Sequence, residues 1–238
     1  MNVPEGFILT AGPGWLAVNK PAGLSVHNDP SGDALSLAKY CLEQDEELGR
    51  VTSFDSLSPA HRLDKETSGV LIFATTRASA SLLQQTFAEA DTRAKKIYRA
   101  VVKGAIESEG RWTSPITDKA EGRENPAGKS AERKPSDTRF RVVKSNTYLT
   151  ELEIDLATGR QHQIRKHAAL AKHPVVGDRR YGDPKHAKMI EMKLGVGRML
   201  LHALSLELTA GSLRIEAEAP RPREFDRVFA SPDDRGTK

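Results

Sequence analysis

A short segment with chemically active side chains lies at residues 61–69 and reads H-R-L-D-K-E-T-S-G. Arg62 and Asp64 flank one apolar residue, so an extended backbone would place their side chains on the same face. A guanidinium keeps a neighbouring carboxylate ionised, because the opposite charge favours the charged form. An ionised carboxylate can attack an electrophilic carbon, so Asp64 is the first candidate for a nucleophile in this chain.

The residues around this segment predict the element that holds it. Residues 70–74 are an uninterrupted apolar run between turn-forming residues, which is typical of a strand buried on both faces. Thr67 and Gly69 are small or turn-forming, so the backbone there can pass close to a ligand. We therefore expect Asp64 at the edge of a sheet. The commoner use of such a pattern is structural, with a loop aspartate that caps a turn and an arginine paired with it.

A second candidate lies in a predicted strand at residues 95–104. Strand alternation places Tyr98 on one face with Lys96 and Ala100, and Arg99 on the opposite face. A tyrosine in a strand is usually a packing residue, because its ring buries well and its hydroxyl reaches a polar partner. By itself the position therefore favours packing over catalysis.

A third candidate segment, residues 159–167, reads G-R-Q-H-Q-I-R-K-H. It follows alternating apolar and acidic residues at 151–156, which indicate a half-buried strand, and it leads into a predicted helix. By default Arg165 would be a surface residue of that helix. His162 and His167 are five residues apart and miss the i, i+4 spacing that presents two ligands on one helical face, so no metal site is predicted.

Together, these segments resemble the motifs of one enzyme family. The pattern H-R-L-D-x-x-T-S-G before an apolar strand is similar to the signature of the RluA-type pseudouridine synthases, whose nucleophilic aspartate falls on Asp64. The family's K-x-Y-x-A motif has a tyrosine near the nucleophile, and this falls on Tyr98. Its G-R-x-H-Q-I-R-x-H motif ends in an arginine that pairs with the aspartate, a role that falls on Arg165. The family usually has threonine where Gln161 stands.

Further segments extend the resemblance from about residue 20 to residue 204. Lys20 begins a K-P-x-G segment, residues 173–182 resemble H-P-x-x-G-D-x-x-Y-G, and residues 201–203 match an L-H-A strand. One such segment is a weak signal, whereas the ordered set is a strong one. Leu201 is expected in the core, with a wall of the uracil pocket as its alternative role. The resemblance implies that substrate is bound by His61, Arg62, Thr67, Lys20, Gln163 and Leu201.

The resemblance also implies an isomerase that converts uridine in RNA to pseudouridine. The N1–C1′ bond breaks, the base turns and C5 replaces N1, so the reaction requires no cofactor or metal. Asp64 would be the nucleophile, Arg165 would hold it ionised and aimed, and Tyr98 would stack on the base and accept a proton. Arg62 is placed to fill the space left by an unstacked uridine. Attack at C1′, attack at C6 and a glycal route are all open.

Two other classes of function share parts of this pattern. A non-catalytic RNA-binding protein would carry the basic surface but would have no reason to combine Asp64, Tyr98 and Arg165. An aspartate-dependent hydrolase would need a second carboxylate or a histidine as its base, and His61 is the only candidate nearby in the sequence. Both hypotheses rank below the isomerase.

Composition fits a soluble globular protein. The 238 residues are 38% hydrophobic and 29% charged, with a net charge of +4 and a pI of about 9.1, which is weak evidence for a nucleic-acid partner. The sequence has no secretory signal and no run of about 18 apolar residues, and its single Cys41 excludes an internal disulfide. We expect a cytoplasmic monomer without membrane association, whose partner is structured RNA, either ribosomal or transfer RNA.

The expected architecture is a single catalytic domain over residues 1–238. It is an α+β fold with a mixed, mostly antiparallel bisected β-sheet, flanking helices and a central RNA-binding cleft with Asp64 on its floor. No N-terminal segment resembles an S4-like RNA-binding domain, so RNA contacts are expected from the catalytic domain. Residues 118–136 are a long polar loop, either a solvated insertion or a basic arm that closes on RNA phosphates. Helices are expected at residues 36–44, where residues 45–49 end the helix, and at residues 77–90.

Overall fold

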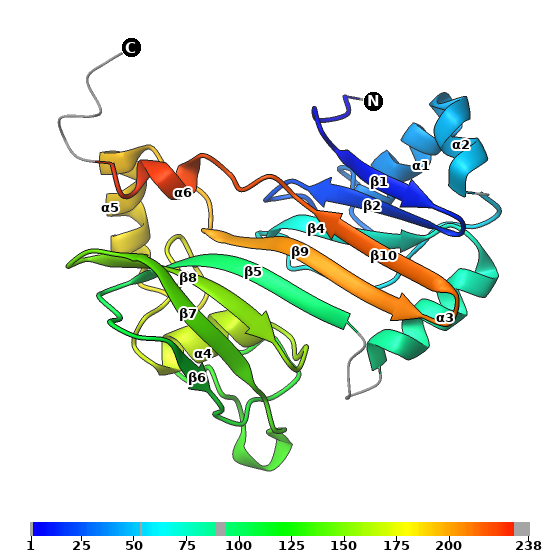
Figure 1. Cartoon of the computed structure of the whole chain (residues 1–238). Helices are drawn as coiled ribbons and strands as arrows, with labels where there is room; N and C mark the ends of the chain where they lie inside the picture. The colour runs from blue at the N-terminus through cyan, green and yellow to red at the C-terminus, as the bar shows by residue number, and fades with distance from the viewer. Residues whose placement is uncertain (1, 53, 89–93, 231–238) are drawn as a thin grey trace. The chain divides into compact units, whose positions relative to one another are not determined.

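A computed structural model of the chain describes residues 2–52, 54–88 and 94–230 (Figure 1). It shows an α+β fold in which the paired strands run antiparallel to their neighbours wherever their register is defined. The predicted fold class, a mostly antiparallel sheet with flanking helices, is therefore confirmed. In the part of the chain that the structure describes, no helix is long and apolar enough to cross a membrane.

The chain divides into two compact units. The first unit comprises Met1–Ile97 and Ala203–Pro220, and the second comprises Tyr98–His202 and Arg221–Lys238. Strands β5 (Ala94–Lys103) and β9 (Leu201–Ala210) each run from one unit into the other. The single domain that the sequence suggests, and the cleft expected between its halves, stay predictions.

The first unit is built on strands in the order β1-β2-β4-β9, with β3 beside β4 and β10 beside β9. The hairpin of β1 and β2 turns through Pro13 and Gly14, as its composition predicts. The turn aligns Gly12 with Trp15. These strands are β1 (Ile8–Gly12), β2 (Trp15–Lys20), β3 (Ser58–Pro59), β4 (Ser68–Ala74) and β10 (Leu213–Glu218).

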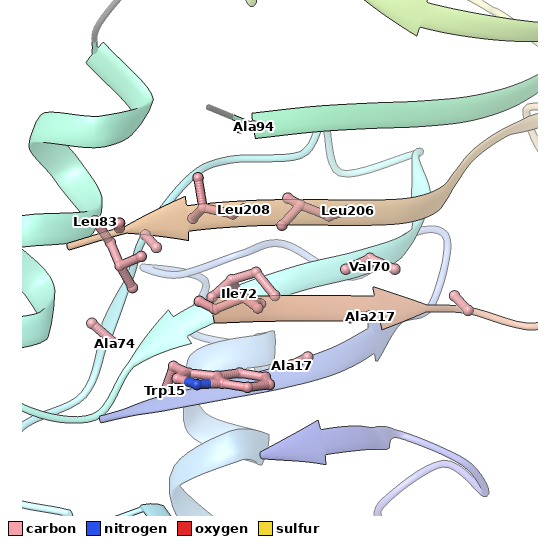
Figure 2. Close-up of a cluster of buried hydrophobic side chains, with 14 residues drawn as sticks. Trp15, Ala17, Val70, Ile72, Ala74, Leu83, Ala94, Leu206, Leu208 and Ala217 are labelled. Atoms are coloured by element: carbon pink, nitrogen blue, oxygen red, sulfur yellow. The ribbon is translucent and has the colours of Figure 1, made fainter. Parts of the chain in front are cut away.

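Strand β4 is the centre of the first unit's core. All seven of its residues are buried, which confirms the doubly covered strand predicted from residues 70–74. Figure 2 shows Ile72 with Trp15 of β2 and Leu206 and Leu208 of β9 in one cluster, onto which Leu83 of a helix also packs. Truncating such a fully buried aliphatic side chain to alanine costs about 2–5 kcal/mol of stability, so this cluster fixes the backbone that enters β4.

The described part of the first unit contains the helices α1 (Ala34–Gln44), α2 (Glu46–Thr52) and α3 (Arg77–Ala88). The helix predicted at residues 36–44 is confirmed as α1, but the prediction that residues 45–49 only end it was wrong. Asp45 ends α1, and its carboxylate then accepts a hydrogen bond of 3.0 Å from the Leu48 N–H, which starts α2. Helix α3 matches the helix predicted at residues 77–90, whose last two residues lie outside the described ranges.

The second unit contains strands in the order β5-β8-β7-β6. Its β7–β8 hairpin pairs Phe140 with Ile154. The remaining elements of this unit are β6 (Gly110–Trp112), β7 (Thr138–Ser145), β8 (Leu149–Leu156), α4 (Gln163–Leu170), α5 (Pro184–Leu194), α6 (Glu224–Arg227) and a 3-10 turn (Ser130–Glu132).

Two hydrophobic clusters cover the two faces of β5. Tyr98 packs at the edge of a cluster that contains Ala100 and also Ile164 of α4, whereas Val101 belongs to a second cluster with Phe225 of α6. The predicted alternation of β5 is therefore confirmed.

The acidic face predicted for β8 differs at one position. Glu151 is 1% exposed, and its carboxylate is held by Arg221 through two hydrogen bonds of 2.8 Å. The expectation of a solvent-facing carboxylate was wrong here, because the C-terminal segment covers this part of the strand. No local pattern in residues 151–156 encodes that cover.

Candidate active site

Asp64 lies in a tight turn before β4, in the first unit. The Thr67 N–H donates to the Asp64 carbonyl over 3.1 Å, and the neighbouring Leu63 is buried at 8% exposure. Arg62 is exposed and Asp64 is half-buried, so the side chains on either side of Leu63 reach the surface. This agrees with the extended backbone expected for residues 62–64, and it places Asp64 on a turn closed by a backbone hydrogen bond.

The K-P-x-G segment anchors this turn from the other side. Lys20 is fully buried, and its ammonium donates to the carbonyl oxygens of Pro21 at 3.0 Å, Leu24 at 2.7 Å and Lys65 at 3.1 Å. The Gly23 N–H also donates to the Lys65 carbonyl, at 2.8 Å. The peptide that follows Asp64 is therefore tied to the bend after β2. This geometry supports a positioning role for Lys20, and its predicted contact with substrate stays a prediction.

The end of the segment is fixed by close backbone packing. Gly69 has φ +110, and a Cβ at this position would lie 2.1 Å from the Ala203 carbonyl oxygen on β9. Only glycine therefore allows β4 and β9 to approach here. Thr67 is 2% exposed, and its hydroxyl has no hydrogen-bond partner among the residues that the structure describes.

His61 supports β4 and is a poor base. Its Nε2 accepts a hydrogen bond of 3.1 Å from the Ile72 N–H, so the lone pair of that nitrogen is occupied. Burial, together with the nearby Lys96 ammonium, lowers the pKa of His61 to about 3. The imidazole is therefore neutral at physiological pH, and its ring packs on Phe87 at 5.0 Å between centroids.

Tyr98 lies in β5 and is the first residue of the second unit. Its ring is half-buried against the cluster that contains Val102 and Leu201. Leu201 is 3% exposed within this cluster, which agrees with the core role favoured from the sequence. The next residue, Arg99, turns to the other side of the strand and pairs with Glu153 at 3.0 Å.

Arg165 is buried rather than exposed, contrary to the default for an arginine on a short helix. It is 3% exposed, and it makes two hydrogen bonds to Asp178, from Nε at 2.8 Å and from Nη2 at 2.9 Å. The Arg165 guanidinium carbon also lies 5.3 Å from the centre of the Tyr181 ring. Burial alone would raise the pKa of Asp178, but the Arg165 guanidinium and two backbone N–H groups hold it below its usual value.

The other polar residues of α4 fasten the helix to its surroundings. The Gln163 amide group donates to the Asp137 carbonyl at 2.8 Å and to Thr138 at 3.0 Å, and its oxygen accepts from Thr158 at 2.7 Å and Arg160 at 3.0 Å. With both N–H groups engaged, Gln163 serves as a positioning residue, and its predicted substrate contact stays a prediction.

Lys166 and His167 are buried and hold residues 114–119. The Lys166 ammonium donates to the carbonyls of Thr117 at 2.8 Å and Lys119 at 2.7 Å. Both ring nitrogens of His167 are used, one by the Thr138 hydroxyl at 2.8 Å and one by the Ser114 carbonyl at 2.9 Å. The start of the polar loop is thus clamped to α4. Whether the loop acts as an arm on RNA stays a prediction.

Sequence reasoning gave no role to Asp178 and Tyr181, although both stand in the segment at 173–182. The signal was present, because a Gly-Asp pair followed three residues later by tyrosine is part of the H-P-x-x-G-D-x-x-Y-G pattern. The contact of Asp178 with Arg165, thirteen positions earlier in the chain, became visible only with the structure.

Comparison with known proteins agrees with the motifs. A family model described as RNA pseudouridylate synthase matches residues 14–170, which is more than half of the chain. The tRNA pseudouridine synthase C of Vibrio parahaemolyticus is 35% identical over 204 residues, which cover 81% of this chain and 80% of that protein. The chain belongs to the RluA-type family of RNA pseudouridine synthases.

Further relatives of this pseudouridine synthase have related names. The ribosomal large subunit pseudouridine synthase C of Escherichia coli is 34% identical over 216 residues, 85% of this chain and 63% of that protein. The solved structure of human RNA pseudouridylate synthase domain containing 1 has a TM-score of 0.70 at 26% identity and covers 93% of this chain and 87% of its own. The synthase is therefore an isomerase that acts on uridine in RNA. The family match spans Asp64, Tyr98 and Arg165 but ends before Asp178.

Proposed function

We propose that this pseudouridine synthase uses Asp64 as its nucleophile on uridines of structured RNA, with Tyr98 and Arg165 as the other members of the catalytic set. The observation that supports this most directly is the setting of Asp64. Its carboxylate is half-buried on a turn whose two flanks are fixed by the Lys20 ammonium and by the glycine contact at β4. A nucleophile held on so rigid a backbone loses little freedom when substrate binds.

The reaction assigns a task to each member of the set. The N1–C1′ bond breaks, a C5–C1′ bond forms, the C5 proton is lost and N1 gains a proton, with no net oxidation or hydrolysis. Asp64 supplies the electron pair that stabilises the separated base and sugar, by attack at C1′, by attack at C6 or by assisting a glycal. Tyr98 stacks on the base and accepts the C5 proton, and Arg165 keeps the carboxylate ionised and aimed. No cofactor or metal takes part.

Around this set we assign substrate contacts to Arg62 because it is exposed, and to Thr67 because its hydroxyl has no partner among the described residues. Arg62 is exposed beside the Asp64 turn, and its planar guanidinium fills the space of the unstacked uridine. Thr67 carries a buried hydroxyl without a protein partner among the described residues, which suits a contact to the substrate. The other predicted substrate-binding residues hold the site in place through backbone hydrogen bonds or core packing: Lys20, His61, Gln163 and Leu201.

The substrate class follows from the names of the relatives. One relative is named for tRNA and another for the ribosomal large subunit, so we propose a uridine in one of these two RNAs, modified in the cytoplasm by a monomer. Mapping pseudouridines in total RNA with and without this gene identifies the position. Loss of sites in messenger RNA alone would contradict this assignment.

A hydrolase is disfavoured by the state of His61. That hypothesis needs His61 as a base, but its Nε2 is occupied by the Ile72 N–H and its pKa is about 3. A histidine with so low a pKa is a weak proton acceptor at neutral pH.

The decisive experiment follows the hydrogen at C5. RNA made with 5-tritiated uridine releases tritium only when C5 forms the new bond, so release by the wild-type chain reports pseudouridine formation. Asp64→Asn should bind the RNA as tightly as wild type but should lower turnover by roughly 10⁴-fold or more, as expected when a covalent nucleophile is lost. Turnover near the wild-type rate would remove Asp64 from the mechanism.

A second experiment tests Arg62. Arg62→Ala should slow turnover on a uridine stacked in a folded RNA more than on a uridine in a flexible loop, because only the stacked base leaves a space to fill. The exposed Lys65→Ala variant serves as the control for loss of a nearby positive charge. Equal losses on both RNAs would count against this role.

A further inference from the structure

The guanidinium of Arg165 has two hydrogen-bonding edges, and the structure fixes one of them. Asp178 takes the edge formed by Nε and Nη2, at 2.8 and 2.9 Å, and both residues are at most 3% exposed. The guanidinium is planar and its five N–H groups are rigidly arranged. When one edge is bound, the direction of the other edge, which carries the Nη1 hydrogens, is therefore set.

Asp178 is itself held by stiff backbone. Its Oδ1 accepts from the N–H groups of Arg180 at 2.9 Å and Tyr181 at 3.1 Å. The segment just before it is bonded to β5 and to the residue before β9: the Val176 N–H donates to the Val101 carbonyl at 2.8 Å, and the Val176 carbonyl accepts from the Leu200 N–H at 2.8 Å. The carboxylate thus has a fixed position relative to β5.

Tyr181 restrains the guanidinium in the remaining direction. Its ring is 3% exposed, and its centre lies 5.3 Å from the Arg165 guanidinium carbon, within cation–π range, so the ring limits how far the guanidinium can move on that side. Its hydroxyl is 2.9 Å from Nδ1 of His162, the residue at the N-terminal cap of α4. Because α4 also carries Arg165, the ring is tied to the same helix whose arginine it covers.

We propose that Asp178 and Tyr181 are positioning residues of the reaction, which set the direction of the second edge of the Arg165 guanidinium, the edge that acts on the nucleophile. This inference rests on the proposed function, in which Arg165 acts on Asp64. Asp178 fixes the in-plane direction of the guanidinium through two hydrogen bonds, and the Tyr181 ring packs beside it. Misplacement of a reacting group by about 1 Å can cost on the order of 10²-fold in rate. A misoriented Arg165 guanidinium should therefore lower kcat strongly.

The variant Asp178→Asn should disturb the orientation of the Arg165 guanidinium while it preserves the local backbone structure. The amide oxygen can still accept from Arg180 and Tyr181, whereas the amide nitrogen is a donor that now faces the Nε–H of Arg165. We expect kcat to fall about 10²-fold. The KM and the dissociation constant for RNA should stay near the wild-type values, because the change touches neither substrate nor surface.

Glu151→Gln is the matched control. Glu151 is also a buried carboxylate that accepts two hydrogen bonds from an arginine in the same unit, the partly exposed Arg221, with both distances at 2.8 Å. Its loss should lower the thermal midpoint by an amount similar to the loss at Asp178, while kcat stays near wild type. If both variants lose kcat equally, the effect of Asp178 is one of general stability and the proposal is overturned.

Chemical rescue gives a readout that a structural role would not move. Arg165→Ala leaves a space next to the carboxylate and the Tyr181 ring, and millimolar guanidinium should restore part of the lost turnover. The double variant Arg165→Ala with Asp178→Asn should show no rescue, because the added guanidinium has lost its anchor. Ethylammonium, a cation without the planar fork, should rescue neither. Equal rescue with and without Asp178 contradicts the proposal.

A second pair of variants covers the case in which Asp178→Asn does not fold. Tyr181→Phe keeps the ring over Arg165 and loses only the hydroxyl bond to His162, whereas Tyr181→Leu removes the aromatic face. We expect the leucine variant to lose more kcat than the phenylalanine variant, with similar RNA affinity. Equal kcat in both variants and wild type overturns the proposal. If Arg165→Ala keeps full tritium release, the proposed role of Arg165 fails. If Arg165→Ala loses tritium release but the Asp178 and Tyr181 variants keep it, only the present inference fails.

Discussion

The two segments that carry the proposed catalytic residues are held in place by different kinds of bond. The Asp64 turn is fixed mostly through main-chain groups, with the Lys20 ammonium on three carbonyls and the backbone of β9 against Gly69. Helix α4 is fixed through side chains, with Arg165 on Asp178 and Gln163 on four partners. A turn leaves peptide N–H and C=O groups available for hydrogen bonds to other segments. In a helix most of these groups are already hydrogen-bonded within the helix, so side chains must hold it in place.

This difference has a consequence for mutation. Substitutions around the Asp64 turn should shift its backbone, so they should lower stability and catalysis together. Changes around α4 should act on single side chains, so stability and catalysis can separate, as expected for Asp178→Asn.

Substitution of Gly69 should be the most damaging change. An alanine Cβ would lie 2.1 Å from the Ala203 carbonyl oxygen, and the backbone has φ +110. We expect Gly69→Ala to lower the free energy of unfolding by roughly 3 kcal/mol or more, measured by urea titration. Gly177→Ala, where the Cβ would lie 2.2 Å from the Arg198 carbonyl, should cost a similar amount in the second unit. Gly23→Ala, with φ +85 but open space, should cost only about 1–2 kcal/mol. A mild Gly69→Ala would show that β4 and β9 can separate there.

The two buried lysines provide the next comparison. Lys20→Met and Lys166→Met each leave buried carbonyl oxygens without their donor, so each should lower the free energy of unfolding by about 1–3 kcal/mol. The Lys65 carbonyl that Lys20 binds adjoins Asp64, so Lys20→Met should also lower kcat, with KM little changed. Lys166→Met should have the smaller effect on kcat. A raised KM with normal kcat in Lys20→Met would instead favour direct substrate binding by Lys20.

Two histidines whose pKa values lie below the ordinary value, His61 and His167, should make the protein sensitive to acid. The pKa of His61 in the folded chain is about 3, below its ordinary value of 6.5, so the unfolded chain binds the extra proton between these values. Stability contributed by neutral His61 is therefore complete above about pH 6.5 and is lost as the pH falls, by at most about 1.4 kcal/mol per pH unit. His61→Gln should flatten the dependence of unfolding free energy on pH in urea titrations. His167, whose pKa burial also lowers, should behave in the same direction in the second unit. An unchanged slope in His61→Gln would mean that His61 is charged in the fold.

Exposed ion pairs should matter least in both units. Lys65 pairs with Asp29 at 2.8 Å and Arg111 pairs with Asp137 at 2.6 Å, with the cation more than half exposed in each case. Because solvent and salt screen such pairs, Lys65→Ala and Arg111→Ala should change the thermal midpoint only slightly, and less at high salt. A large, salt-independent loss in Lys65→Ala would show that this pair holds the Asp64 turn.

Much of the fold could be predicted because it depends on local patterns. The apolar run at residues 70–74 is typical of a doubly covered strand, and the alternation around Tyr98 placed Ala100 and Val101 on opposite faces, as the two clusters show. Helix α2 was missed because the acidic residues at 45–47 are typical both of a helix end and of a helix start. The contact that Asp45 makes decides between them.

The candidate site could be predicted only as far as its motifs reach. The segment at 61–69 is contiguous, so its turn, its strand and the half-buried position of Asp64 follow from neighbouring residues. The burial of Arg165 did not follow, because an arginine on a short helix is exposed unless a carboxylate distant in sequence reaches it. The same reason explains Lys20 and Glu151, two charged residues that the structure buries against carbonyls and an arginine.

The amino-acid sequence by itself determined the family, the order of strands and helices near the motifs, and the side chains able to do chemistry, since each depends on residues close together in the chain. Tertiary structure alone decided which charges are buried and what compensates them. The free energy of a buried charge depends on partners within a few ångströms. In this protein those partners, such as Asp178 for Arg165, are brought close by folding and by no local pattern.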